Sequence, residues 1–213
     1  MGYEITQSLF VGKSTLLVEG PSDILYLKAL SSALRRRGRV TLEPKIVLCP
    51  SGGIGNILPF VSLFRGQRLT IGVVADCAKG EKSALERLRK SEILKASSVL
   101  SADQFTGKPE ADIEDLFEAD LFVALLNQVY GLDGGHELTV EKLDAADAST
   151  PRLVKKAEAY FRTLPEEIPT FDHYRPAEWL IENPNFMDGG DESKSRTLDR
   201  AEVLIRAINL LFE

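Results

Sequence analysis

The sequence predicts an α/β fold with a mainly parallel sheet flanked by helices. Short apolar runs typical of buried strands occur at 16–18, 45–49, 69–75 and 99–100, and segments with helical periodicity separate them. The run at 69–75 is almost continuously apolar, as expected for a parallel strand that is covered on both faces. In such folds a site lies outside the carboxyl ends of the strands.

The helices between these strands follow from spacing and from helix-ending residues. Apolar side chains at helical spacing predict a helix over 23–37, and Gly38 is placed to end it. A second helix opens at 51–56 and runs to residue 64, and its first N–H groups are free to face an anion. A third helix is predicted over 80–94.

The pattern changes beyond Pro109, where helical segments follow one another without strands. Helices are predicted at 111–129, 140–146, 151–164, 176–182 and 194–212. We therefore expect a catalytic domain over 1–116, completed by the final helix in 190–213, and an inserted small helical subdomain over 117–189. The apolar stripe of the last helix indicates that it packs back onto the sheet.

Acidic residues stand at the ends of two of the predicted strands. Glu19 follows the first strand and Asp76 follows the strand at 69–75, while Gly20 and Pro21 permit a tight turn that places Asp23 in the first turn of the next helix. Carboxylates gathered beside an apolar core repel each other unless a cation pairs with them. The sequence therefore predicts a Mg²⁺ site that includes these three side chains.

Composition and charge narrow the class of protein. The chain has 213 residues, with 26 Lys and Arg against 32 Asp and Glu, and a net charge of −6. This balance disfavours nonspecific adhesion to polyanions but does not exclude an enzyme that acts on nucleic acid. Cys49 and Cys77 have no CxxC spacing, which predicts reduced thiols and a cytoplasmic location. No apolar segment approaches the roughly 20 residues that span a bilayer, so we expect no membrane partner.

A short segment imitates a phosphate-binding loop. Gly12-Lys13-Ser14-Thr15 matches the end of a P-loop, but Gln7 occupies the place of its first glycine, and a strand follows where a helix should begin. We therefore expect no ATP site in this chain.

Two sequence blocks together resemble the Toprim domain. They are Val18-Glu19-Gly20-Pro21-Ser22-Asp23 and Val73-Val74-Ala75-Asp76. Toprim domains occur in primases, type IA and II topoisomerases, recombination mediators and the OLD (overcoming lysogenization defect) nucleases. The general second block reads Asp-x-Asp, whereas Ala78 stands in the second aspartate position here. A further acidic block at 110–117 resembles the extra motif of the OLD family.

The resemblance to OLD nucleases implies a function and a larger set of site residues. It implies a DNA endonuclease that uses two Mg²⁺ or Mn²⁺ ions, the first held by Glu19, Asp23 and Asp76 and the second by Asp112 and Glu114, with sharing of Asp76 between both ions left open. Glu19 and Asp76 are expected to be catalytic, and the family also carries a late lysine. Lys194, at the head of the last helix, is the candidate for that charge.

The resemblance also implies partners. OLD proteins carry an ATPase domain before the Toprim part, so the chain is expected to be the C-terminal region of such a protein or a stand-alone Toprim protein. DNA is the expected substrate, and self-association into a homo-oligomer is left open. Two alternatives remain: a noncatalytic metal-binding or assembly module of DNA repair or recombination, which Ala78 favours, and a topoisomerase or primase, for which the sequence shows neither a cleaving-tyrosine domain nor a zinc module.

Other charged residues carry less information. Arg35, Arg36, Arg37 and Arg39 are compatible with contacts to a phosphate backbone and equally with a solvated helix end. His173 stands in a loop-like stretch without neighbouring ligands, so no metal or acid–base role is expected for it.

Overall fold

The computed structural model describes residues 12–63, 69–94 and 98–213. Its centre is a four-stranded, all-parallel sheet in the order β2-β1-β3-β4. The strands are β1 (Ser14–Val18), β2 (Ile46–Pro50), β3 (Thr70–Ala75) and β4 (Val99–Ser101). The predicted α/β fold with a parallel sheet is thus confirmed.

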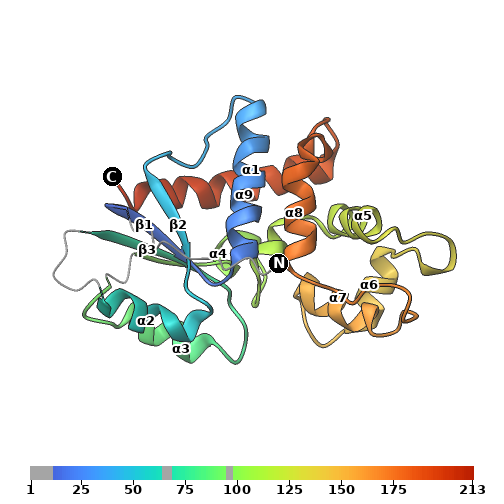
Figure 1. Ribbon diagram of the computed structural model, residues 1–213, viewed down its shortest axis with the longest axis horizontal. Helices are drawn as coiled ribbons and strands as arrows, with labels where there is room; N and C mark the ends of the chain where they lie inside the picture. The colour runs from blue at the N-terminus through green and yellow to red at the C-terminus, as the bar shows by residue number, and fades with distance from the viewer. Residues whose placement is uncertain (1–11, 64–68, 95–97) are drawn as a thin grey trace, which may run out of the picture.

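Helices cover both faces of the sheet (Figure 1). Side chains alternate along a strand, so Leu16 and Val18 face one layer while Leu17 faces the other. One layer contains α1 (Pro21–Arg36) and α9 (Glu192–Leu210). The opposite layer contains α2 (Ile54–Leu63) and α3 (Lys82–Arg89).

The last helix returns to the sheet, as its apolar stripe predicts. A Cβ atom at Gly72, in β3, would lie 2.8 Å from a methyl group of Leu211 and 3.0 Å from the ring of Phe212. Glycine therefore allows the end of the chain to approach the strand closely.

The segment between sheet and last helix is helical. It contains α4 (Asp103–Thr106), the 3₁₀ turn η2 (Ile113–Leu116), α5 (Ala119–Tyr130), η3 (Gly134–His136), α6 (Val140–Ala146), α7 (Leu153–Phe161), α8 (Tyr174–Glu182) and η4 (Pro184–Met187). Its apolar side chains belong to the same buried cluster as Leu16 and Leu27. These helices therefore extend the core on the α1 side of the sheet, and the boundary at 117–189 stays a prediction.

One predicted helix is divided in the structure. The segment 111–129 was expected to be a single helix, but η2 and α5 are separate because Phe117 has an extended backbone (φ −73°, ψ 146°). Asp115 accepts a hydrogen bond from the backbone N–H of Asp112 (2.8 Å) and so closes the short turn on itself. This division places the acidic block in a compact turn rather than along one face of a helix.

Both cysteines are free and buried. In the part of the chain that the structure describes, no helix is long and apolar enough to cross a membrane.

Candidate active site

The Glu19 side chain forms hydrogen bonds with the segments that follow the two strands beside β1. It follows β1, and β1 lies between β2 and β3 in the sheet. Its carboxylate accepts hydrogen bonds from the backbone N–H of Asp76, just after β3 (2.9 Å), and from that of Ile54, at the start of α2 (3.1 Å). The anion predicted to face the start of this helix is thus the side chain of Glu19 itself.

Asp23 lies one turn into α1 on the same edge of the sheet. Its carboxylate accepts a hydrogen bond from the backbone N–H of Gly20 (2.9 Å), and the residue is only 8% exposed. Burial and repulsion from Asp112 raise the pKa of Asp23 despite this hydrogen bond. The side chain caps the helix and also adds negative charge to the site.

A small antiparallel bridge brings the acidic block 110–117 to this edge. The backbone N–H of Cys77 donates to the carbonyl of Ala111 (2.8 Å), and the N–H of Ala111 donates to the carbonyl of Cys77 (3.0 Å). Asp76 then accepts a hydrogen bond from the N–H of Ile113 (3.2 Å). The turn that carries Asp112 and Glu114 therefore lies directly beside Asp76.

We call the five carboxylates at this edge the acidic cluster: Glu19, Asp23, Asp76, Asp112 and Glu114. Burial, followed by repulsion from the four other members, raises the pKa of Asp76 well above its ordinary value. Burial is also the main cause that raises the pKa of Glu19 to about 7. The structure thus places all five residues at one edge of the sheet, and their role as metal ligands stays a prediction.

Two members of the cluster have basic partners. Asp112 is 2% exposed and forms a salt bridge with Arg152, whose Nε lies 2.9 Å from both carboxylate oxygens. Glu114 is 3% exposed, and its nearest basic group is the His173 ring at 3.5 Å. Hydrogen bonding to Glu114 raises the pKa of His173, whose other ring nitrogen lies 3.2 Å from Glu158.

Asp115, the next acid of the block, has a structural role. It is fully buried, accepts from the backbone N–H groups of Asp112 and Leu153, and forms a salt bridge with Lys108. These contacts fix the acidic turn against the start of α7.

Tyr26, on α1, carries a buried hydroxyl group that is influenced by the charges of Glu114 and Asp23. Its hydroxyl is buried and makes no hydrogen bond among the described residues. Burial and the negative charge of Glu114 raise its pKa well above the ordinary value. Its ring packs edge-on against Phe117, at 5.7 Å between centroids.

The structure does not bring Lys194 to the acidic cluster. Its ammonium group donates to the carbonyl of Asp188 (2.8 Å) and lies 3.2 Å from Asp191. Asp188 in turn pairs with Arg36, at the far end of α1 from Asp23. Thirteen residues of helix separate Asp23 from Arg36, roughly 20 Å at 1.5 Å per residue. The structure thus binds the Lys194 ammonium group away from the acidic cluster, and its catalytic role stays a prediction.

The basic run after α1 also has local partners. Arg36 and Arg37 donate to backbone carbonyls in the segment 184–189, and Arg39 forms salt bridges with Asp199 and Glu202 of α9. Arg36, Arg37 and Arg39 are thus bound within the protein, whereas Arg35 is exposed. The three bound arginines join α1 to the C-terminal segment.

Arg152 and His173 are the site residues that the sequence reasoning missed. Arg152 precedes α7 at its N-cap, where a cation faces the positive end of the helix dipole. That unfavourable position is the one sequence signal that could have indicated a nearby anion. His173 was expected to lack partners, and this expectation is wrong because the fold places two carboxylates beside its ring.

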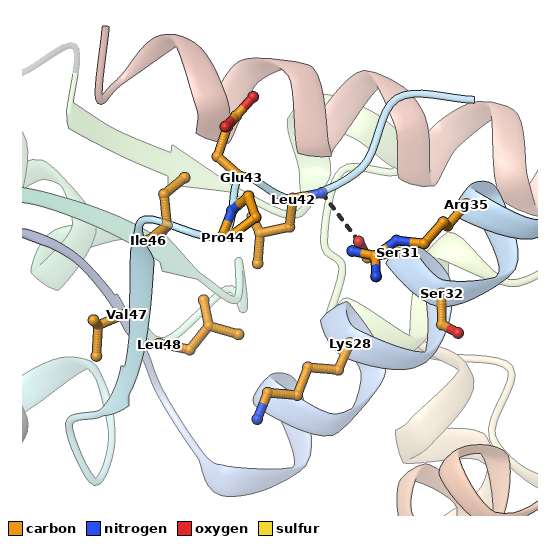
Figure 2. Close-up of a pocket in the computed structure, with 10 residues that line it drawn as sticks. All are labelled: Lys28, Ser31, Ser32, Arg35, Leu42, Glu43, Pro44, Ile46, Val47 and Leu48. Atoms are coloured by element: carbon orange, nitrogen blue, oxygen red, sulfur yellow. Dashed lines mark hydrogen bonds between the residues drawn. The ribbon is translucent and has the colours of Figure 1, made fainter. Parts of the chain in front are cut away.

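A hollow on the surface lies away from the acidic cluster. This groove of about 480 Å³ runs between α1 and the edge strand β2, where Lys28 and Arg35 line it together with apolar side chains of the strand (Figure 2). The backbone N–H of Leu42 donates to the hydroxyl of Ser31 at its rim (3.0 Å). None of the predicted site residues lines it.

The donor set of the cluster suits a hard divalent ion, because all five side chains offer carboxylate oxygens. Within residues 12–63, 69–94 and 98–213, however, no three His, Cys, Asp or Glu side chains are grouped so that they could hold a metal ion. Glu19 and Asp76 instead accept hydrogen bonds from backbone N–H groups. Metal binding by these residues therefore stays a prediction.

Comparison with known proteins gives matches among solved structures. The C-terminal region of the Xanthomonas campestris pv. campestris OLD protein, in a structure phased with iodine, is 15% identical and has a TM-score of 0.48, with 92% of this chain and 97% of that chain covered. The platinum-phased structure of that region is 14% identical, with a TM-score of 0.47 and coverage of 96% and 99%. This is the family that the sequence motifs resemble. At this identity and TM-score the similarity gives no evidence about activity. No family model and no curated protein matches the chain.

Proposed function

We propose that the chain is a metal-dependent phosphodiester hydrolase that cleaves DNA. The observation that carries the proposal is the acidic cluster itself, where five carboxylates from β1, α1, β3 and η2 meet at the carboxyl edge of a parallel sheet. Ligand sites of open α/β folds lie at this edge. The choice of DNA rests on the resemblance of the sequence motifs to OLD nucleases.

The charge balance of the cluster favours a bound cation. Arg152 and His173 are its basic neighbours, and His173 carries charge only when it is protonated. Glu19, Asp23 and Asp76 form no salt bridge with a Lys, Arg or His side chain of the described residues. A Mg²⁺ or Mn²⁺ ion would offset this repulsion, and these three side chains are the ones that would hold it.

Such an ion would supply charge stabilisation and a water of lowered pKa for attack on phosphorus. The chain's own residues provide the surroundings. Glu19 links the strand ends so that the loop after β3 keeps Asp76 at the edge, and the buried pair of Asp112 with Arg152 holds a guanidinium group beside the carboxylates. That cation would stabilise negative charge on a phosphate bound at the cluster.

Nicking of supercoiled plasmid by the purified chain tests this function. We expect cleavage that needs Mg²⁺ or Mn²⁺ and falls at least a hundredfold in Glu19→Gln and Asp76→Asn, because each removes a charged ligand. Glu178→Gln is the matched control, since it removes one exposed carboxylate on α8 outside the cluster. Cleavage that continues in chelator, or at full rate in both cluster variants, would refute the assignment.

A noncatalytic metal-binding or assembly module is the second candidate. One observation favours it: Ala78 stands where the general motif has a second aspartate. Under this reading divalent ions would raise the melting temperature of the wild type, but plasmid would stay intact.

The wider context follows the same resemblance. We propose that an ATPase domain precedes this region in the full-length protein, that the protein acts in the cytoplasm, and that it forms a homo-oligomer. Size-exclusion chromatography with light scattering, with and without DNA, tests the last point, and a monomer under both conditions would contradict it.

A further inference from the structure

We propose that the acidic cluster holds one divalent ion rather than two, and that the Arg152 guanidinium takes the place of the second ion. The inference rests on the proposed metal-dependent function and makes it more specific. It assigns the catalytic cation to a residue that the sequence motifs do not indicate.

The first observation is the state of Asp112, an expected ligand of the second ion. Arg152 contacts both of its oxygens through Nε, at 2.9 Å each, and through Nη2. The Asp112 side chain is 3% exposed and the Arg152 side chain is 15% exposed, so the pair is shielded from water. Removing one partner of a buried pair is strongly unfavourable, so a metal ion would have to displace a well-held cation here.

The second observation concerns Glu114, the other expected ligand of that ion. It is buried beside the His173 ring, which also contacts Glu158 of α7. Both carboxylates assigned to the second ion therefore face basic side chains of the protein. The three assigned to the first ion form no salt bridge within the described residues. Among the described residues, basic side chains thus contact one side of the cluster and form no salt bridge on the other.

The third observation is the set of donors that Arg152 keeps free. A guanidinium group has five N–H donors, and here Nε and Nη2 point to Asp112 while Nη1 makes no hydrogen bond to a described residue. Burial lowers the pKa of Arg152, but the hydrogen bonds and charge of Asp112 and then the charge of Asp76 raise it above its ordinary value. The group is thus charged, near Asp76 and able to donate to a phosphate oxygen.

Arg152 comes from a loop rather than from the sheet edge. The hydrogen bond from the N–H of Leu153 to Asp115 (3.1 Å) and the salt bridge of Lys108 with Asp115 fix that loop beside the acidic turn. The position of the guanidinium is therefore set by the same turn that carries Asp112 and Glu114. In the proposed reaction it contacts a non-bridging phosphate oxygen and exchanges no proton.

Counting bound Mn²⁺ ions by electron paramagnetic resonance, with equilibrium dialysis, tests the inference without measuring activity. We expect one tightly bound ion per wild-type chain, loss of that ion in Asp76→Asn, and a second bound ion in Arg152→Gln because Asp112 is released. Arg152→Lys should keep a single ion because the positive charge remains. Arg87→Gln, an exposed arginine on α3, is the matched control.

The outcomes separate this inference from the proposed function. Two ions on the wild type, with nicking that depends on Glu19 and Asp76, would overturn the role of Arg152 and leave the metal-dependent function standing. No ion on the wild type at millimolar Mn²⁺ would remove both. If Arg152→Gln does not fold, a count of one ion on Arg152→Lys with cleavage reduced at least tenfold supports the inference, and two ions on that variant contradict it.

Discussion

The burial of Glu114 makes the stability of the metal-free protein depend on pH. Glu114 is 3% exposed, and burial raises its pKa from 4.5 to about 7 even though the His173 ring partly opposes this. A carboxyl group with a raised pKa in the folded state holds its proton more tightly there than in the unfolded chain. Its contribution to stability is therefore fully present below pH 4.5 and is lost as the pH rises through 7.

The size of this effect follows from the two pKa values. The difference between 4.5 and about 7 corresponds to roughly 3 kcal/mol of folding free energy between pH 4 and pH 8. The raised pKa of His173 acts in the same direction, because its stabilising charge is also lost as the pH rises. In Glu114→Gln both contributions are removed or weakened, so the unfolding free energy should change less with pH.

Thermal unfolding of wild type and Glu114→Gln in chelator, at pH 5 and pH 8, measures this. We expect the variant to gain stability relative to wild type on going from pH 5 to pH 8, by about 5–10 °C in melting temperature for roughly 2.5 kcal/mol in a domain of this size. Glu178→Gln, with an exposed side chain, should show no such difference. Equal melting-temperature changes of Glu114→Gln at both pH values would refute the reasoning.

Three further variants test other parts of the account. Tyr26→Phe removes a buried hydroxyl without a partner, so the unfolding free energy in urea should stay equal or rise by about 1 kcal/mol, and a loss of 2 kcal/mol would contradict the assignment. Lys194→Ala should cleave plasmid within twofold of the wild-type rate, because the ammonium group is bound to the Asp188 carbonyl far from the cluster, and a hundredfold loss would restore its catalytic role. Arg39→Ala should lower the unfolding free energy by about 1 kcal/mol at pH 7, and by less once the pH falls through the lowered pKa of Glu202, so an effect that does not change across an acid titration would contradict the salt bridge.

The sheet and its acidic edge could be predicted because local signals specify them. Apolar runs of the right length indicated the four strands, and a parallel sheet places the residues after β1 and β3 side by side. Glu19, Asp23 and Asp76 follow directly from these positions. The division of η2 from α5 was missed because Asp115 caps its own turn, which helical spacing does not reveal.

The contacts of Arg152 and His173 with the acidic cluster could not be predicted, because they depend on packing between distant segments of the chain. Arg152 is 40 residues from Asp112 in the chain, and it reaches Asp112 only because α7 packs beside η2. Lys194 is the opposite case, because it was expected at the site and the fold places it elsewhere. Its position at the head of α9 matches the motif, but the contacts of α9 with α1 place that helix end near Arg36 instead of Asp23.

Anomalous scattering from a crystal soaked in Mn²⁺ tests the central claim most directly. The account predicts a single anomalous peak in contact with the carboxylates of Glu19 and Asp76, while the Arg152 guanidinium remains on Asp112. The absence of a peak at these carboxylates, at an Mn²⁺ concentration that supports plasmid nicking in solution, would contradict it.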